Sequence, residues 1–322
     1  MLMVETEKFY SKILLFGEYS VLLGSMALSI PYSHFQGELS FIHEDKYTDL
    51  DFAVTSNKLL RELGQYLKEN ASLASVLDVD LFEKELMQSL YFESSIPQSY
   101  GIGSSGALCA ALYGRYAKER ISASGAISQV QIKELRDIFS SIESFFHGKS
   151  SGIDPLSCYM KVPLLIRKDG DIDLVGIPRN HSDKDSGIFL LDSGTSGKTG
   201  PLVSKFLSKF SPSGKVSAVG EELIQLNDRC IQNLISGDYS AFWLNVKALS
   251  RFQLVNLTEM IPDKLASVWA EGLTSDSFYL KLCGSGGGGF LTGFAPNFLA
   301  VSNYLSASKF THFPVYLSRL QE

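Results

Sequence analysis

Hydrophobic residues recur along the chain with two different periods, which predict a mixture of strands and helices. Segments rich in Ile, Leu, Phe and Tyr between turn residues predict strands. Segments in which apolar residues recur every three or four positions predict helices. The strands are expected at 9–16, 26–42, 188–192, 278–283, 290–294 and 313–318. The helices are expected at 56–69, 80–90, from Gly103 to about Ser122, and at 129–147, 199–210, 216–236, 239–250 and 297–308.

The order of these elements also indicates a fold class and a division into domains. Strands and helices follow each other without strict βαβ alternation, which favours an α+β fold over a doubly wound parallel sheet. The chain has 322 residues, a length that indicates two domains at about 100–200 residues each. A polar, turn-forming segment at 177–187 lies between them. We therefore expect an N-terminal domain over 1–180 and a C-terminal domain over 181–322.

Composition limits which partners the protein can bind and indicates the cellular compartment in which it works. There are 29 Lys and Arg against 35 Asp and Glu, so the net charge is −6, which argues against broad binding to nucleic acid or anionic membranes. The apolar run at 13–16 is too short for the core of a signal peptide, and no stretch approaches a membrane span. The four cysteines form no CxxC pair, so neither a zinc knuckle nor a dithiol is indicated. We expect a soluble protein of the cytoplasm.

The first of three glycine clusters is Gly101, Ile102, Gly103, Ser104, Ser105 and Gly106, which has the letters GxGxxG. A dinucleotide-binding fold would need a strand directly before this motif and an acidic residue after a second strand, whereas Pro97 interrupts the upstream segment and Glu119 is expected inside a helix. Small residues that open a long helix are better suited to holding a phosphate against the first N–H groups. A purely structural turn stays an alternative.

The second and third clusters also suggest backbone close to a ligand. Residues 193–199 resemble a Walker A loop, but Asp192 stands where that motif needs glycine, so the match fails and a donor-rich or plain loop remains. Residues 284–289 contain four consecutive glycines, which lose much conformational entropy on folding. Apolar flanks argue against a flexible linker there. We interpret this run as backbone that passes tightly against a ligand or a catalytic loop.

A carboxylate and an imidazole lie one helical turn apart in Glu143-Ser-Phe-Phe-His147, so they share a face near the end of the expected helix. Asp154 follows between a glycine-containing turn and a proline. Alone, these residues are also compatible with a surface pair and an ordinary turn. Together with the glycine clusters, one carboxylate that could bind Mg²⁺ and one that could accept a hydroxyl proton suit phosphoryl transfer.

With these motifs in order, the sequence resembles the GHMP kinase superfamily, and within it most closely the mevalonate kinase family. The segment from Lys12 to Gly24 is similar to the motif GKxxLxGEHxVxxG, 97–106 to PxxxGLGSSA, and 281–289 to KLTGAGGGG. The segment 143–154 is similar to ExxxHGxxSGxD, and 192–199 to DTGxxxxT. These stretches extend over both expected domains.

The resemblance implies a two-domain fold with the active site in the cleft between the domains, and a phosphotransferase that uses ATP and Mg²⁺ with a small-molecule alcohol as acceptor. It implies that Asp154 accepts the substrate proton, that Lys12 stabilises negative charge, that 101–106 holds phosphates, and that Ser105 and Glu143 bind Mg²⁺. It also implies substrate contacts from Glu18, Tyr19, His147, Thr199, Gly286 and Gly287. Homodimers occur in the superfamily, although no residue here establishes an interface.

Departures from the motifs concern the acceptor. Tyr19 stands where mevalonate kinases usually have His, and Ser99 where they commonly have Gly. The segments 17–19 (GEY) and 100–106 (YGIGSSG) look more like phosphomevalonate kinases, which usually lack the segment at 143–154. Because the segment 143–154 is present here, mevalonate is the favoured acceptor, with phosphomevalonate or another small alcohol as alternatives. A metabolite-binding regulator on the same scaffold is disfavoured because Lys12, Ser105, Glu143 and Asp154 are all present.

Overall fold

The computed structural model describes residues 7–42, 49–178, 185–197 and 200–317. The chain forms two compact units whose segments alternate along the sequence. Unit 1 consists of Met1–Lys12, Pro31–Pro97 and Gly103–Val162, and unit 2 of Ile13–Ile30, Gln98–Ile102 and Pro163–Glu322. The predicted domain boundary after residue 180 divides the sequence at a single point and remains a prediction.

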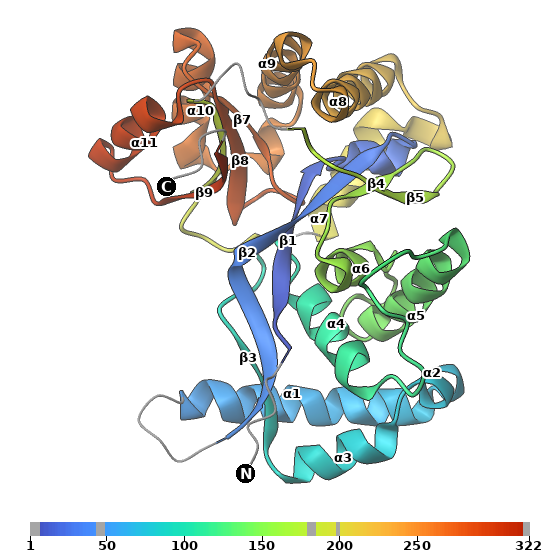
Figure 1. The fold of residues 1–322 in the computed structure, drawn as a ribbon. Coiled ribbons are helices and arrows are strands. Elements are labelled where there is room, and N and C mark those ends of the chain that lie inside the picture. Colours follow the sequence, from blue (N-terminus) through green and yellow to red (C-terminus); the bar gives the residue numbers. More distant parts are fainter. Residues whose placement is uncertain (1–6, 43–48, 179–184, 198–199, 318–322) are drawn as a thin grey trace. The chain divides into compact units, whose positions relative to one another are not determined.

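Unit 1 is mainly helical (Figure 1). It contains the first half of β1 (Phe9–Phe16), most of β2 (Ala27–Phe41), and β3 (Leu90–Ser94), which pairs antiparallel with the end of β2. Its helices are α1 (Leu50–Glu69), α2 (Ala71–Val76), α3 (Val79–Met87), α4 (Ser104–Tyr116), α5 (Gln129–His147) and α6 (Ile153–Met160). In Figure 1, α4, α5 and α6 lie together as one packed group.

Side-chain caps fix where several helices of unit 1 begin. Asp49, Asn70 and Asp78 accept backbone N–H groups in the first turns of α1, α2 and α3. Ser128 and Gln131 form a capping box at the start of α5. Each such cap satisfies a backbone donor that the helix itself leaves unpaired. The start of α4 differs, since Gly103 precedes it without a capping side chain.

Unit 2 holds the remainder of β1 and β2, two further strands beside them, and a separate antiparallel sheet in the order β7-β8-β6-β9. The strands are β4 (Leu164–Ile166), β5 (Ile172–Leu174), β6 (Gly187–Asp192), β7 (Tyr279–Leu282), β8 (Phe290–Ala295) and β9 (His312–Leu317). The helices are η1 (Ser20–Leu23), α7 (Gly200–Phe210), η2 (Pro212–Gly214), α8 (Ala218–Ser236), α9 (Tyr239–Asn256), η3 (Thr258–Met260), α10 (Asp263–Ser275) and α11 (Phe298–Ala307). In Figure 1, α8 and α9 lie side by side.

The hydrophobic pattern predicts the long elements well and the short ones poorly. Each expected strand and helix has a counterpart, and the α+β class is confirmed. The elements α2, α6, α10, β3, β4 and β5 were not anticipated. The predicted end of α4 near Ser122 is wrong, because Ala117 leaves the helix to form a β-bridge with Leu77. Glu119 consequently lies beyond this helix rather than inside it.

The length and hydropathy of a helix decide whether it can span a membrane. A spanning helix needs about 20 predominantly apolar residues. Among the described residues, no helix combines sufficient length with sufficient hydropathy.

Candidate active site

A lysine and an aspartate from distant parts of the sequence form the centre of the site in unit 1. Lys12 on β1 places its Nζ 2.9 Å from Oδ2 of Asp154, which lies in the first turn of α6. The Lys12 side chain is 5 % exposed, whereas that of Asp154 is 41 % exposed. The ammonium group is therefore enclosed by protein while the carboxylate stays open to solvent on one side.

Two glycines make this contact sterically feasible. Gly103 has φ +80°, and a Cβ there would lie 2.9 Å from Cγ of Lys12, so a side chain would block the lysine stem. Gly152 has φ +73°, and a Cβ there would lie 2.1 Å from the carbonyl oxygen of Arg136 on α5. Glycine adopts these left-handed conformations without steric cost. The two glycines thus let Lys12 reach Asp154 and let α6 begin directly against α5.

A second carboxylate, Glu143 on α5, lies next to this pair. Ser105 at the start of α4 donates to its Oε1 at 3.1 Å, and Ser150 donates to its Oε2. Burial and the nearby charge of Asp154 raise the pKa of the Glu143 carboxyl, while the two serines and Lys12 act in the opposite direction. His147, one turn further along α5, is exposed, and its Nε2 lies 3.2 Å from the Ser105 hydroxyl oxygen.

The donor atoms of this cluster suit a hard divalent cation. A carboxylate and a hydroxyl oxygen are ligands that Mg²⁺ accepts, usually together with water and substrate phosphates. A bound cation would also compensate the negative charge of Glu143, whose pKa is raised by burial and by the charge of Asp154. Among the described residues, no group of three or more His, Cys, Asp or Glu side chains surrounds a common point. Ser105 and Glu143 are oxygen donors of the kind that hold a cation together with water and a ligand.

The start of α4 is suited to an anion. Gly103 is its N-cap and provides no side-chain acceptor, and Ser104 and Ser105 occupy the first helical turn. The first N–H groups of a helix carry partial positive charge and bind phosphates when no side chain caps them. Ile102, immediately before, is 1 % exposed and belongs to the core. The segment 103–106 thus combines a free helix start with two hydroxyl groups.

Gly106 shows how closely α4 and α6 approach each other. A Cβ at this position would lie 2.9 Å from the carbonyl carbon of Asp154 and 3.0 Å from the nitrogen of Pro155. These contacts are with backbone, which cannot move aside as a flexible side chain could. The absence of a side chain at 106 therefore sets the distance between α4 and the segment that carries Asp154.

Unit 2 contains a different lysine–carboxylate pair. Nζ of Lys281 on β7 lies 2.5 Å from Oε1 of Glu18, and the two side chains are only 2 % and 1 % exposed. Lys281 also donates to the carbonyl oxygen of Leu282 at 2.7 Å and lies 5.7 Å from the centre of the Phe16 ring. Both charges are thus enclosed by protein, and the predicted contact of Glu18 with a substrate remains a prediction.

Tyr19 follows Glu18 in a conformation that is uncommon for a residue with a side chain, with φ +63°. Its hydroxyl donates to the carbonyl oxygen of Ser285 at 2.5 Å, and its ring lies 4.6 Å from the ring of Phe206. Burial raises the pKa of Tyr19 to about 12, so the hydroxyl keeps its proton at neutral pH. The Tyr19 hydroxyl thereby connects the motif after β1 with the glycine run.

The glycine run at 284–289 packs backbone against backbone with two other loops of unit 2. A Cβ on Gly101 would lie 2.9 Å from the carbonyl oxygen of Cys283, and one on Gly288 would lie 2.5 Å from that of Ser196. The amide of Gly289 donates to the carbonyl oxygen of Thr195 at 2.6 Å. The interpretation of this run as tightly packed backbone, not a linker, agrees with these contacts.

The remaining expected site residues are placed as follows. Gly286 is buried and Gly287 exposed, and the amide of Gly287 donates to the carbonyl oxygen of Met260 at 2.6 Å. Thr199 lies outside the described residues. Two functional candidates were not found from sequence, Ser150 as a partner of Glu143 and Lys281 as a partner of Glu18. A lysine inside an otherwise apolar strand was the one available signal for Lys281.

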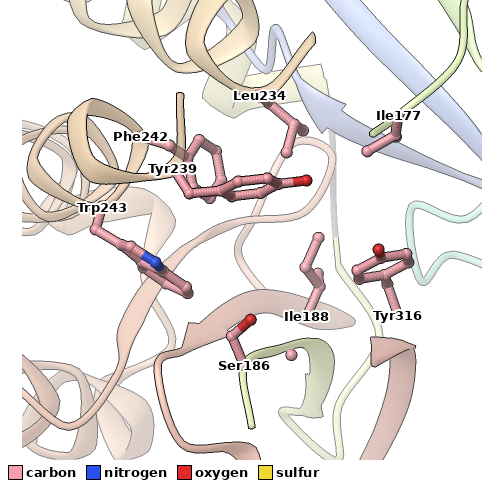
Figure 2. Close-up of a pocket in the computed structure, with 9 residues that line it drawn as sticks. Ile177, Ser186, Ile188, Leu234, Tyr239, Phe242, Trp243 and Tyr316 are labelled. Atoms are coloured by element: carbon pink, nitrogen blue, oxygen red, sulfur yellow. The ribbon is translucent and has the colours of Figure 1, made fainter. Parts of the chain in front are cut away.

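An apolar hollow elsewhere in unit 2 contains none of the expected site residues (Figure 2). It is lined mainly by aromatic and aliphatic side chains, among them Tyr239, Phe242, Trp243 and Tyr316. The Tyr239 hydroxyl donates to the carbonyl oxygen of Pro178. None of the residues that line this hollow is Lys, Arg or His.

Part of the chain is similar to a known protein family. Residues 65–161 match the model of the GHMP kinases N terminal domain. This range includes α4, α5 and α6, and therefore Ser105, Glu143 and Asp154. No curated protein sequence matches the chain.

Solved structures extend the likeness to the whole chain. The mevalonate kinase of L. major, solved with R-mevalonate, is 16 % identical with a TM-score of 0.62, and the match covers 99 % of this chain and 98 % of that one. The phosphomevalonate kinase of Streptococcus pneumoniae, with phosphomevalonate and AMPPNP, is 12 % identical with a TM-score of 0.58, covering 96 % and 99 %. The galactokinase of Lactococcus lactis, with galactose, is 14 % identical with a TM-score of 0.61, covering 98 % and 94 %.

These findings confirm the resemblance to the GHMP kinase superfamily and the two-domain α+β fold. The family model matches 65–161, and the solved structures show a similar fold over nearly the whole chain. Because three enzymes with different acceptors share this fold at low identity, the fold leaves the acceptor open.

Proposed function

We propose that the protein is a kinase that transfers the γ-phosphoryl group of ATP to a hydroxyl group of a small molecule. The observation that carries this proposal is the contact of the enclosed Lys12 ammonium with the half-exposed Asp154 carboxylate, beside Glu143 on α5 and Ser105 at the start of α4. Phosphoryl transfer needs positioning and charge neutralisation more than covalent participation by the protein. Asp154 can position the acceptor hydroxyl, and Lys12 can neutralise negative charge.

In the proposed reaction, the bond between the γ-phosphorus and its bridging oxygen breaks and a bond to the acceptor oxygen forms. Asp154 takes the proton that the acceptor hydroxyl loses, for which its open side is suited. Lys12 stays charged against Asp154 and stabilises the negative charge of the transferred group. ADP leaves with the electron pair of the broken bond.

The start of α4 and the cluster around Glu143 have a separate task in this proposal. The first N–H groups of α4, together with the hydroxyl of Ser104, hold the nucleotide phosphates. Ser105 and Glu143 would hold Mg²⁺, which would neutralise phosphate charge when bound. Ser150 keeps the Glu143 carboxylate oriented by donating to its second oxygen. His147 lies beside Ser105 at the exposed edge and is proposed to contact the substrate.

Among acceptors we propose mevalonate, with formation of 5-phosphomevalonate as a precursor of isoprenoids. The proposal is supported by the segment 143–154, which resembles the mevalonate kinase motif, and by the likeness to an enzyme solved with R-mevalonate. Phosphomevalonate is the second candidate, favoured by the segments 17–19 and 100–106 and by the likeness to a phosphomevalonate kinase.

The test is a coupled assay of ADP release with Mg·ATP and four acceptors in parallel: mevalonate, phosphomevalonate, homoserine and galactose. Turnover of mevalonate alone is the expected result. Turnover of phosphomevalonate alone would replace the acceptor and keep the reaction. If ATP binds but none of the four is phosphorylated, a metabolite-binding regulator becomes the better description.

A further inference from the structure

The ion pair of Glu18 and Lys281 is almost fully enclosed by protein. Their side chains are 1 % and 2 % exposed, so neither charged group can be reached from solvent. Enclosing two charges is unfavourable unless they are well paired, and two apolar residues are often at least as stabilising. A buried pair of this kind is therefore better explained by the geometry that it imposes.

That geometry joins two segments at two points. Lys281 lies before the glycine run and binds Glu18, while Ser285 lies inside the run and accepts from the neighbouring Tyr19. The Tyr19 ring is itself fixed against Phe206 on α7. Consecutive residues of one turn thus hold the chain on both sides of Cys283 and Gly284.

The stretch held between these two points lies against the first glycine of the expected phosphate loop. A Cβ on Gly101 would lie 2.9 Å from the carbonyl oxygen of Cys283, and a Cβ on Gly284 would lie 3.1 Å from Cα of Gly101. Gly101 has φ +79° and Gly284 φ +73°. The backbone of Gly101 is therefore supported directly by the backbone that the turn of Glu18 and Tyr19 holds.

We propose that Glu18, Tyr19 and Lys281 form a clamp that fixes the glycine run at 284–289 against Gly101, and that they are positioning residues for nucleotide binding rather than contacts of the acceptor. The proposal rests on the function proposed above. A run of four glycines samples many conformations unless it is attached at defined points. The clamp supplies those points, one through an ion pair and one through a hydrogen bond.

The clearest variant is Tyr19→Phe, because it removes one hydrogen bond while the ring on Phe206 and the buried ion pair remain. Lys281→Met is the less suitable choice, because removing one member of a buried ion pair is strongly destabilising in itself. A matched control is Tyr239→Phe, which removes another tyrosine-to-carbonyl hydrogen bond of unit 2, that to Pro178.

The first readout is amide hydrogen exchange in the full chain, which does not depend on activity. The amides of Gly197, Gly287 and Gly289 donate to Ser99, Met260 and Thr195 and therefore report on the loops that the clamp holds. In Tyr19→Phe we expect these amides to exchange about threefold to tenfold faster, the range that the loss of one net hydrogen bond gives. In Tyr239→Phe they should exchange as in the wild type. Equal exchange in all three proteins would overturn the clamp.

The second readout separates nucleotide from acceptor. Tyr19→Phe should raise KM for ATP about threefold to tenfold and leave KM for the acceptor unchanged. A rise confined to the acceptor KM would instead place Tyr19 at the acceptor and overturn the positioning role. If exchange increases as expected but wild-type protein binds no ATP, the clamp stands as a structural device, while its nucleotide role and the proposed function both fail.

Discussion

The two units each contain a lysine paired with a carboxylate at short distance, and the pairs differ in exposure. Lys12 and Asp154 of unit 1 are 2.9 Å apart with the aspartate 41 % exposed. Lys281 and Glu18 of unit 2 are 2.5 Å apart with both side chains almost fully enclosed. A reacting group must be reachable by its substrate, whereas a group that fixes the chain need not be. The first pair is therefore suited to chemistry and the second to holding the backbone.

The difference in exposure between the two pairs shows that a residue's presence in a motif does not by itself define its role. The resemblance to the superfamily implied a site role for both, catalysis for Lys12 and substrate contact for Glu18. Exposure separates them, because an enclosed ion pair is strongly coupled to folding and a half-exposed one is coupled weakly. Activity and stability should consequently respond to different substitutions.

The largest effect is expected from Asp154→Asn. Loss of the proton acceptor should lower kcat by about 10²–10⁴-fold, the usual contribution of general acid–base catalysis. The free energy of unfolding should change by about 1 kcal/mol or less, because the group is partly solvated and an amide oxygen can still accept from Lys12. Steady-state kinetics and urea unfolding measure both quantities. Activity within tenfold of wild type would remove Asp154 from the reaction.

Breaking the other pair should have the opposite profile. Lys281→Met removes one member of the enclosed ion pair with Glu18, so the free energy of unfolding should fall by about 3–5 kcal/mol. Urea or thermal unfolding is the measurement. A fall of less than about 1 kcal/mol would show that water reaches Glu18 and that the contrast between the pairs does not hold.

The capping box of α5 allows the stability of the protein to be lowered without altering either lysine–carboxylate pair. Ser128→Ala removes the capping box of α5, whose other end carries Glu143 and His147, and should cost about 1 kcal/mol. We expect kcat to stay within twofold of wild type, since the cap lies at the opposite end of this helix from the carboxylate. A proportional loss of kcat would mean that the cluster depends on the stability of α5 as a whole.

The smallest effect is expected from the double substitution Glu18→Met and Lys281→Met. With both charges removed and similar volume kept, the free energy of unfolding should lie within about 1 kcal/mol of wild type. The coupling between the two positions follows from a double-mutant cycle that includes both single variants. Additive losses would indicate that the two charges act independently.

Sequence reasoning reached the parts of the site that depend on local spacing. Glu143 and His147 share a helix face because they are four residues apart, and the structure places both beside Ser105. The long helices and strands followed from apolar periodicity in the same way. Contacts such as Ser150 with Glu143 were missed, because a serine in a turn gives no periodic signal.

Two further kinds of feature could not be predicted from the sequence: contacts between distant segments and unusual backbone conformations. Nothing in the local pattern of β7 indicates that Lys281 pairs with Glu18, since their contact arises only when distant segments fold together. Ser99 and Tyr19, both departures from the mevalonate kinase motif, adopt φ +62° and +63°. Non-glycine residues seldom occupy this region, so the sequence alone predicts neither conformation.

Gly106 has a consequence for protein engineering. Replacing a residue by the one most frequent in its family is a common way to stabilise a protein. The phosphate-loop motif that this sequence resembles ends in alanine, so that approach would introduce Gly106→Ala. The added methyl group would lie 2.9 Å from the backbone of Asp154 and push α4 and α6 apart. Here the substitution that family statistics favour is the one that the local packing forbids.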